Sequence, residues 1–542
     1  MPAQRRVRPL VSFGAMAITA MLLLAACTAS SPSPSGSAAA SEAPSGPRLL
    51  KVATTAAVTT WDPIASFSTE AFYMGNLYEP LLWVNPPGSS NALTPALATS
   101  WETSSDGLTW TFHLREGVKF HDGTDMNADA VVASIEAAKD HAGASFIWAP
   151  LDTIEATDAT TVAMHLKYAA PMDLVASSLY GAWIVSPKAL TAFAADATYF
   201  DKGVDAGTGP YTIESYTSGS EVVLSRFDGY WGGWDDAKHY EKVVVTITPE
   251  AVVQQQMLEG GDVDMAFSIP FENIASFKTN PDFTVVEEPS FFNYVGLFNT
   301  QRAPLDNPLV RQALSWAIPY DEIIQAGAQG YGTQSHGPVP AGVFPWSADV
   351  PQYKQNLDTA RKLLKDAGHE GGGFKLEITY ASENQNEERF APLIKDAFDS
   401  IGVETTITPM LFDAQWKRAK SDDTAARQDL FLLLYWPTYS DAGADNLWSL
   451  YHSSAKPFFN LSYWKDEGYD KLVDDAGALT ATDRAGAQAK YVDAMKLIYD
   501  QAPGISFYDT KAVFPIPKKI AGYQYNLNYP FAQFFYPLHP AA

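Results

Sequence analysis

Residues 357–410 alternate between the hydrophobic periods of helices and strands, and this alternation restricts the fold more than any other feature of the chain. The apolar residues of "DTARKLLKDAG" and "ERFAPLIKDAFDSIG" recur at helical spacing, and each run ends at a glycine, Gly368 or Gly402. Between and after these helices, "FKLEITY" and "VETTITP" have the two-residue period of strands. This helix–strand–helix–strand order predicts a mixed α/β lobe with some parallel strand pairing.

Strand and helix patterns continue outside this segment. The β-branched runs that predict strands lie at 49–55, 221–227 and 242–249. Alternating residues in "TWTFHLREGVKF" predict a half-buried strand pair at 109–120. Helix starts are predicted at Asn127, as a cap residue, and at Asn307, where Pro308 takes the first helical position.

Length and charge narrow the class of protein. A chain of 542 residues is too long for one hydrophobic core, so two to four domains or subdomains are expected. The net charge of −25 argues against nucleic acid as a partner, because phosphate binding needs clustered cations. The single cysteine excludes an intramolecular disulfide framework and any multi-cysteine metal site.

The first 26 residues have the organisation of a secretory signal. Three arginines precede an uncharged run over 10–26, which is at the short end of what spans a bilayer, so a transmembrane helix is the alternative. Cys27 directly follows "LLAA" and resembles the lipid-modified first residue of bacterial lipoproteins. Residues 28–47 are almost entirely Ser, Ala, Pro, Gly and Thr, a composition that predicts a flexible tether.

The chain contains no local catalytic motif. It has no GxSxG, HExxH or GxxxxGK[ST], and "GTGPY" at Gly207 is not a dinucleotide-binding fingerprint. Asp262 and Asp264 lack the further oxygen ligands of a calcium loop, which favours a turn. The sequence therefore predicts binding rather than catalysis, with no cofactor and no metal. A glycosidase stays open, because its carboxylates carry no local motif.

Aromatic side chains are abundant, with 29 Phe, 26 Tyr and 14 Trp. Some of them cluster in loop-like segments at 290–298, 432–443 and 528–540. Core and interlobe packing accounts for most such residues, but aromatic walls also suit sugars, peptides and apolar side chains. These segments are therefore candidates for a ligand cavity.

Residues 93–134, from "LTPALATSWE" to "MNADAVVAS", resemble the signature of extracellular solute-binding proteins of ABC transporters, the peptide, oligosaccharide and nickel-binding class called family 5. Further blocks agree in the same order: "GTGPYTIESY", "EGGDVDMAF", "DNPLVRQALSWAI", "TARKLLKDAG" and "QAPGISFYD". The resemblance implies an α/β, two-lobed, periplasmic-binding-protein-like fold of type II, class C, with an extra inserted subdomain in lobe I.

The resemblance also implies domain boundaries and hinges. The implied segments are a signal peptide at 1–26, lipidated Cys27 and tether at 27–47, lobe I at 48–297 with the insertion at about 91–204, lobe II at 298–511, and a return to lobe I at 512–542. Crossings near Asn299 and Tyr508 would be the hinges about which the lobes close and expel water from a bound solute.

Candidate ligand residues come from the same resemblance. In peptide binders, the loop equivalent to "YWPTYSDAG" carries an acid three residues after its Trp, which pairs with the peptide amine. Counted from Trp436 this position is Tyr439, and Asp441 follows, so the amine anchor is absent, displaced onto Asp441 or unneeded. Trp436 and Tyr439 would pack against the solute, and Asp441 would accept hydrogen bonds. The other implied ligand-binding residues are Trp61, Phe291, Phe292, Asn293, Tyr294 and Tyr508.

The sequence thus predicts a lipid-anchored, extracytoplasmic receptor that binds an oligopeptide-like solute and delivers it to the permease of an ABC importer without transforming it. The alternatives are an oligosaccharide receptor of the same fold and a secreted carbohydrate-active hydrolase. Nickel capture is a third alternative, for which His336 and His452 are the suggestive residues. A monomer is expected, with the solute, the permease subunits and the membrane as its partners.

Overall fold

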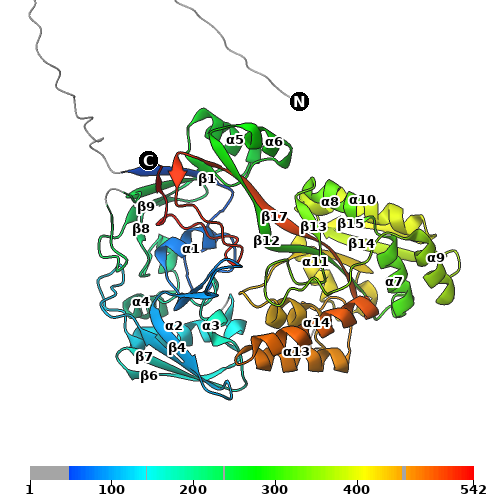
Figure 1. Cartoon of the computed structure of the whole chain (residues 1–542), viewed down its shortest axis with the longest axis horizontal. Helices are drawn as coiled ribbons and strands as arrows, with labels where there is room; N and C mark the ends of the chain where they lie inside the picture. The colour runs from blue at the N-terminus through cyan, green and yellow to red at the C-terminus, as the bar shows by residue number, and fades with distance from the viewer. Residues whose placement is uncertain (1–47, 142, 236–237, 454–458, 542) are drawn as a thin grey trace, which may run out of the picture. The chain divides into compact units, whose positions relative to one another are not determined.

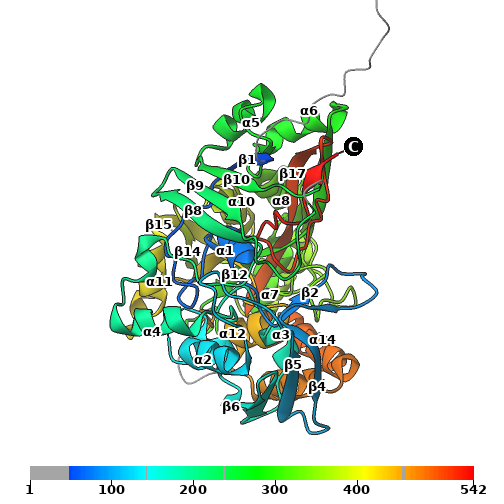
Figure 2. The same ribbon diagram turned by 90° about the vertical axis from the view of Figure 1, so that its left-hand side faces the viewer.

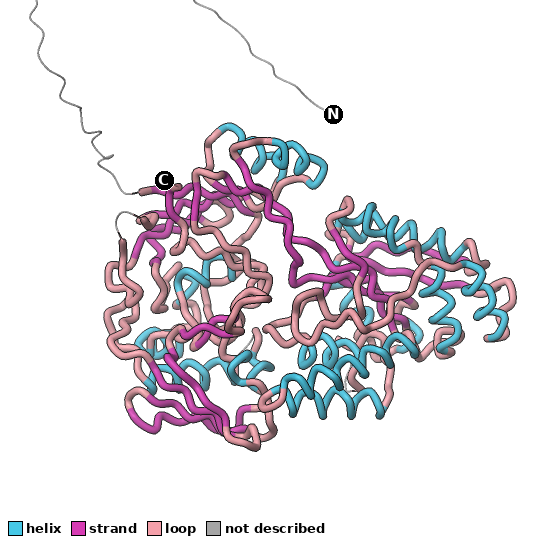
Figure 3. The backbone as a smooth tube through the Cα atoms, in the orientation of Figure 1, coloured by secondary structure: helices cyan, strands magenta, loops and turns pink. Residues whose placement is uncertain are grey.

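The computed structural model describes residues 48–141, 143–235, 238–453 and 459–541. The predicted signal peptide, Cys27 and the tether lie outside the described residues. This part of the chain forms two α/β lobes, and two long strands run between them (Figure 1). Helices gather around the second lobe, whereas the first is richer in strands and loops (Figure 3). Among the described helices, none combines the length and apolar character needed to span a bilayer.

Lobe I is built on a five-stranded sheet in the order β11-β1-β10-β9-β8. β1 lies parallel to both β10 and β11, and the other pairs are antiparallel. Alternate residues of β10 are buried, so one face of the sheet enters the core. The strands are β1 (Leu49–Thr54), β8 (Tyr211–Thr217), β9 (Glu221–Arg226), β10 (Lys242–Ile247) and β11 (Met265–Ala266). The helices are α1 (Ala71–Leu77), α5 (Ala251–Gly260), η3 (Phe271–Asn273) and α6 (Ile274–Thr279), of which α5 and α6 lie together near β1 (Figure 2).

A four-stranded antiparallel sheet in the order β4-β5-β7-β6 lies wholly within residues 91–204. Helix α2 packs on it, and the Asn127 side chain accepts a hydrogen bond from the Ala130 N–H (3.0 Å), which confirms the predicted cap. The elements of this region are β3 (Leu93–Pro95), β4 (Ala98–Thr103), β5 (Thr109–Leu114), α2 (Ala128–Lys139), η1 (Ser145–Trp148), β6 (Leu151–Asp158), β7 (Thr161–Leu166), α3 (Met172–Val175), α4 (Pro187–Ala195) and η2 (Phe200–Lys202). The short strand β2 (Leu82–Val84) precedes the region and pairs antiparallel with β3.

The predicted strand pair at 109–120 is wrong in its second half. Only Thr109–Leu114 forms a strand, and the chain then turns at Gly117, whose φ is +76°. A residue with this φ is outside the extended region, so the strand cannot continue through it. Lys119 forms only an isolated bridge with Asp125.

The glycines of "GTGPY" allow two backbone segments to touch. A Cβ on Gly207 would lie 2.0 Å from the carbonyl oxygen of Leu77, and one on Gly209 would lie 2.5 Å from that of Asn76. The Gly209 N–H also donates to the Leu77 carbonyl oxygen (2.9 Å). The motif is therefore a contact between the start of β8 and the end of α1.

Lobe II is built on a six-stranded sheet in the order β13-β17-β12-β16-β14-β15. β14 is parallel to both of its neighbours, which confirms the parallel pairing predicted for residues 357–410. Gly368 and Gly402 end their helical segments with φ of +85° and +88°. The strands are β12 (Phe283–Phe298), β13 (Gly332–Gln334), β14 (Lys375–Ala381), β15 (Glu404–Met410), β16 (Leu430–Tyr435) and β17 (Gly504–Pro517).

Helices cover this sheet and continue beyond it. Asn307 caps the first of them, with its side chain 3.0 Å from the Leu309 N–H, and Pro308 stands at the first position as predicted. The helices are α7 (Pro308–Ala317), α8 (Tyr320–Ala328), α9 (Leu357–Asp366), α10 (Gln385–Asp399), α11 (Phe412–Ala419), η4 (Thr424–Ala426), the π-helical turn η5 (Gly443–Leu447), α12 (Trp448–Tyr451), α13 (Glu467–Thr480) and α14 (Arg484–Gln501). The C-terminal segment adds the short strands β18 (Ile520–Ala521) and β19 (His539–Pro540).

Strands β12 and β17 belong to both lobes (Figure 1). Phe514 and Ile516 of β17 lie in the core of lobe I, whereas Ile505 and Phe507 lie in that of lobe II. The two strands pair antiparallel along both halves, and their register shifts at two places, between Pro289 and Asn293 and between Tyr294 and Val295. A β-ladder bends most easily where its hydrogen bonds are interrupted, so a movement between the lobes would be accommodated at these shifts.

Candidate functional site

The loop after β16 carries three of the predicted site residues, and Asp441 shapes it. One carboxylate oxygen of Asp441 accepts hydrogen bonds from the backbone N–H groups of Gly443 (2.9 Å) and Ala444 (3.1 Å), which start the turn η5. The other oxygen is buried and has no partner among the described residues. Burial raises the pKa of Asp441 to about 7.

Asp445 ties the two ends of this loop together. Its carboxylate accepts hydrogen bonds from the Tyr435 hydroxyl (3.1 Å), from the Ser449 hydroxyl (3.3 Å) and from the Thr438 backbone N–H. The pKa of Asp445 is raised by complete burial. The loop therefore holds a fixed shape, with two carboxyl groups inside it rather than on its surface.

A small cavity lies where this loop meets lobe I. Its walls come from 177–180 after α3, Phe291 of β12, 436–440 of the loop, and 528–531 of the C-terminal segment. The hydroxyl of Ser178 donates to the carbonyl oxygen of Thr438 (3.1 Å), which links the two lobes directly. The cavity volume is about 10 Å³, the space of a single water molecule.

Aromatic rings form one side of this interlobe cavity. The ring centroids of Phe292, Trp436 and Phe531 lie 5.1 to 5.8 Å apart in edge contacts. Tyr439 packs against the core of lobe I, and burial raises its pKa well above the usual value. The cluster brings together rings from β12, the loop after β16 and the C-terminal segment.

Every residue that lines the interlobe cavity is uncharged. Asp441 follows Ser440 of the wall but is not itself part of the lining. The described ion pair that spans the lobes joins Asp173 and Arg484, with one guanidinium nitrogen 2.6 and 2.7 Å from the two carboxylate oxygens. The charge of Arg484 also acts on Asp441, whose pKa it lowers against the stronger effect of burial.

The structure brings only some of the predicted residues to this cavity. Phe291, Trp436 and Tyr439 line it, and Phe292 stands in the ring cluster. Asn293 is buried, and its side-chain N–H donates to the carbonyl oxygen of Pro338 (2.7 Å). The predicted residues of the loop after β16 and of the second half of β12 thus lie at or beside this cavity, and their contact with a solute stays a prediction.

Three predicted residues lie in core packing instead. Tyr294 and Tyr508 pack against each other in the core of lobe II, with ring centroids 4.9 Å apart. Trp61 packs in the core of lobe I against Tyr73 (5.8 Å) and Tyr216 (5.2 Å). None of the three lines the interlobe cavity.

Two segments of the cavity wall were not among the predicted site residues. Residues 528–531 belong to an aromatic-rich stretch, so aromatic clustering gave a signal for them. Residues 177–180, "SSLY", follow α3 and carry no motif, and no local pattern could have identified them.

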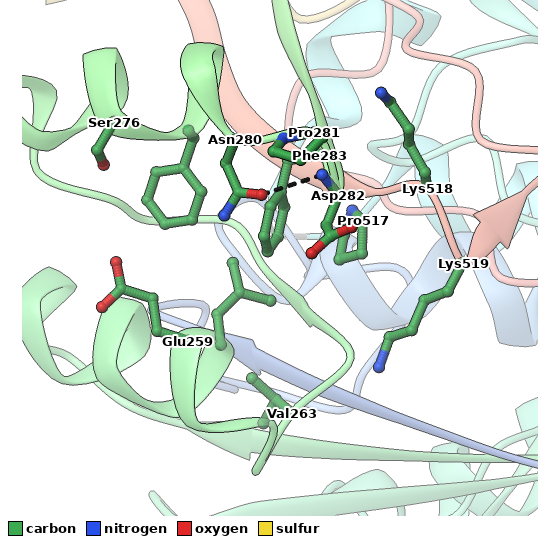
Figure 4. Close-up of a pocket in the computed structure, with 12 residues that line it drawn as sticks. Glu259, Val263, Ser276, Asn280, Pro281, Asp282, Phe283, Pro517, Lys518 and Lys519 are labelled. Atoms are coloured by element: carbon green, nitrogen blue, oxygen red, sulfur yellow. Dashed lines mark hydrogen bonds between the residues drawn. The ribbon is translucent and has the colours of Figure 1, made fainter.

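A larger hollow of about 650 Å³ lies elsewhere, among α5, α6 and the ends of β12 and β17 (Figure 4). Its apolar side includes Phe277 and Phe283, which contact each other at 5.1 Å, and its Lys519 is already paired with Asp264 (2.6 Å). No residue of the loop after β16 reaches it. We place the candidate solute site at the interlobe cavity, because both lobes contribute to its wall.

Metal ligands do not gather within the described residues: no three His, Cys, Asp or Glu side chains converge there. His336 interacts with the carbonyl oxygen of Val350 (2.7 Å). His452 lies 3.3 Å from a carboxylate oxygen of Asp474.

Comparison with known proteins identifies a family model for this chain. The model of bacterial extracellular solute-binding proteins, family 5 Middle, matches residues 92–458. The matched region contains most of lobe II, the four-stranded sheet of lobe I and the loop that carries Trp436 and Asp441.

Relatives with described ligands are similar over most of their length. A glutathione-binding protein of Pectobacterium atrosepticum is 30% identical over 449 residues, which cover 80% of this chain and 83% of the relative. A heme-binding protein of Haemophilus influenzae is 28% identical and covers 80% and 82%. The dipeptide-binding protein of Escherichia coli is 28% identical and covers 79% and 83%.

Solved structures share the fold. A periplasmic binding protein associated with an ABC transporter of Helicobacter pylori, solved with the peptide STSA, superposes with a TM-score of 0.75. Its sequence is 25% identical, and the match covers 91% of this chain and 98% of the other. The two-lobed α/β architecture is therefore that of the periplasmic binding proteins.

Proposed function

This chain belongs to the bacterial extracellular solute-binding proteins of family 5, and we propose that it captures an oligopeptide-like solute between its lobes and delivers it to the permease of an ABC importer. The observation that carries the proposal is the interlobe cavity, because residues of both lobes line it and lobe II contributes the loop after β16. Relatives that bind glutathione and dipeptides, and a structural neighbour with a bound peptide, support a peptide-like solute.

Binding requires the lobes to separate and close. A cavity of about 10 Å³ admits no peptide, so the solute enters when the lobes part and is enclosed when they return. Strands β12 and β17 connect the lobes, and the two register shifts in their ladder, within residues 289–295, suit them to this movement. Closure excludes water from the site and strengthens each polar contact with the solute.

The uncharged wall sets the chemistry of the solute. No carboxylate lines the cavity, so a free peptide amine would find no acid to pair with. Asp441 follows the lining residue Ser440, but its partnerless carboxylate oxygen is fully buried. Hydroxyl groups of Ser178, Thr438 and Tyr439, backbone groups and the ring cluster remain as contacts. We therefore expect the peptide backbone and side chains, rather than a terminal charge, to supply most of the affinity.

An oligosaccharide is the second candidate for the solute. The three-ring cluster of Phe292, Trp436 and Phe531, together with a neutral wall, also fits the faces of sugar rings. A sugar should lose affinity when its hydroxyl groups are removed, whereas a peptide should lose affinity when its amide groups are replaced. Binding experiments with such analogues therefore separate the two candidates.

The protein's place at the membrane follows from its N-terminal sequence. We propose that Cys27 carries the lipid anchor, that residues 28–47 form the tether, and that the folded lobes act as a monomer next to the permease. A single acyl chain holds a protein weakly, so the anchor requires more than one chain on the cysteine.

The deciding experiment is mass spectrometry of small molecules that remain bound to the purified native protein. Calorimetry then compares a recovered peptide with its N-acetylated form, and the two are expected to bind with similar affinity. Recovery of sugars alone would replace peptide by saccharide. Strong loss of affinity on acetylation would show that an acid does pair with the amine. Conversion of the solute during incubation would instead reveal a hydrolase.

A further inference from the structure

Lobe I contains a second cavity, about 460 Å³ in volume, between the β2–β3 hairpin and the C-terminal segment 522–537. Gly75 and Asn76 of α1, together with Glu79, Pro210 and Tyr230, complete its wall. Tyr529 is the residue that this cavity shares with the interlobe cavity, and none of the loop after β16 reaches it. The volume is in the range of sites for small organic ligands. We refer to it as the lobe I cavity.

Seven aromatic residues line the lobe I cavity. Trp83 meets Phe534 at 5.2 Å and Tyr529 at 5.4 Å, with the ring planes near perpendicular. Tyr230 and Tyr536 meet in the same way at 5.0 Å. The further aromatic residues of the wall are Tyr523 and Tyr525. Edge contacts of this kind hold rings in place, and Trp83, Phe534 and Tyr536 are only partly buried.

The charge of the lobe I cavity is one-sided. Glu79 is the sole carboxylic acid among its lining residues, and no Lys, Arg or His lines it. Glu79 accepts hydrogen bonds from the Thr208 hydroxyl (2.8 Å), the Trp231 indole N–H (2.8 Å) and the Tyr230 hydroxyl (3.1 Å). Burial raises its pKa to about 7, and a cation nearby would favour its ionised form.

The polar side chains of this wall are largely occupied within the fold. The Asn76 side chain donates to the Gln533 carbonyl oxygen (2.7 Å) and accepts from the Phe535 N–H (2.9 Å). The Asn526 side chain donates to the Val84 carbonyl oxygen (2.7 Å), and the Gln533 side chain accepts from the Tyr523 hydroxyl (3.0 Å). A ligand rich in hydroxyl groups would find few free partners here, which argues against a sugar.

We propose that the lobe I cavity binds an organic cation, with a quaternary or tertiary ammonium group held by its aromatic rings and by Glu79. The face of an aromatic ring is negative and attracts a cation, and the attraction increases where water is excluded. A quaternary ammonium needs no hydrogen-bond acceptor, which agrees with the occupied amides of the wall. The net charge of −25 draws cations toward the protein. This site is separate from the proposed solute site, so either proposal can fail without the other.

Calorimetry on the folded protein with choline, benzyltrimethylammonium and 3,3-dimethyl-1-butanol tests the proposal. The last compound has the shape of choline without its charge, so it isolates the contribution of the cation. We expect at least one of the two ammonium compounds to bind about tenfold more tightly than the alcohol. The proposal is overturned if neither ammonium compound binds more tightly than the alcohol, or if neither binds at millimolar concentration.

Matched variants at Tyr525 locate the binding. Tyr525→Leu keeps an apolar side chain but removes the π-face, whereas Tyr525→Phe keeps the ring. Cation affinity is expected to fall about tenfold in the first variant and to stay unchanged in the second. Phe412→Ala, an exposed aromatic on α11 in lobe II, is the control and should bind as the parent does. Equal affinity of the Leu and Phe variants would contradict a cation–π site, and circular dichroism checks that each variant is folded.

Discussion

Asp173 and Arg484 form an ion pair across the two lobes, with the Arg484 Nη2 atom 2.7 and 2.6 Å from the two carboxylate oxygens of Asp173. Asp173 lies on α3 of lobe I, and Arg484 is the first residue of α14 in lobe II. Next to the start of α14, Gly107 approaches Ala481 so closely that a Cβ on the glycine would be 3.3 Å away. In Figure 1, α3 and α14 lie below β12 and β17, the strands that connect the lobes. We therefore expect both contacts to favour the closed arrangement of the lobes.

Substitution Asp173→Asn removes the charge of this pair and should weaken solute binding. The Asp173 side chain is only 8% exposed while that of Arg484 is 36% exposed, so we expect the pair to contribute about 1 kcal/mol, near the upper end for exposed pairs. Because closure and binding are linked, the dissociation constant should rise about fivefold. Calorimetry with the recovered solute measures the affinity, and small-angle scattering measures the closed fraction.

The control for this pair is Asp493→Asn. Asp493 lies on α14, as Arg484 does, and pairs with Lys496 at 3.7 Å, and both side chains are well exposed. It should leave affinity and scattering unchanged. If Asp173→Asn behaves like this control, the pair does not stabilise the closed state.

Trp436→Ala should reduce solute affinity about tenfold or more, since a large aromatic side chain in the wall of a binding site is costly to remove. Trp436 lines the interlobe cavity and contacts Phe292 and Phe531 at 5.8 Å. Trp436→Phe preserves a ring in the cluster and should keep most of the affinity. Unchanged binding by the alanine variant would exclude the ring cluster from the solute site.

Much of the fold could be predicted because its signals are local. The helices that start at Asn307 and end at Gly368 and Gly402 have caps and stops written in a few adjacent residues. The strand pair at 109–120 failed because period-two alternation continued past Gly117, whose backbone leaves the extended region. The pairing order of the sheets depends on contacts between distant residues and has no local signal.

For the candidate site, only the loop that carries the family pattern could be located from the sequence, and which of its residues contact a solute stays a prediction. The loop with Trp436 and Tyr439 has a recognisable pattern, and the structure places it at the lobe boundary. Trp61, Tyr294 and Tyr508 show the limit, because an aromatic residue next to a crossing packs into a core as readily as into a cleft. Ser178 illustrates the converse, since its contact with Thr438 arises from tertiary structure alone.

Cys27→Ser should release the protein from the membrane without changing its affinity for the solute. Cys27 precedes the folded lobes by a Ser-, Ala- and Pro-rich segment, so its modification affects attachment and not the site. Cell fractionation and mass analysis of the mature N-terminus measure the effect. Retention of the serine variant in the membrane fraction would indicate that residues 10–26 stay in place as a membrane anchor.

Asp441→Asn should make the stability of the protein less dependent on pH. Burial raises the pKa of Asp441 in the folded state to about 7, above the usual value near 4 of the unfolded chain, so the folded state holds the proton more strongly. The free energy of unfolding therefore falls as pH rises from about 4 to 7, by about 1.4 kcal/mol for each unit of raised pKa. Asparagine keeps the acceptor for the Gly443 and Ala444 N–H groups and carries no charge, so the variant should gain stability over the parent at pH 8 and little at pH 5. Urea unfolding at both pH values measures this difference, with the exposed Asp358→Asn as control. A variant that loses stability equally at both pH values would show that the carboxylate itself is required for the loop.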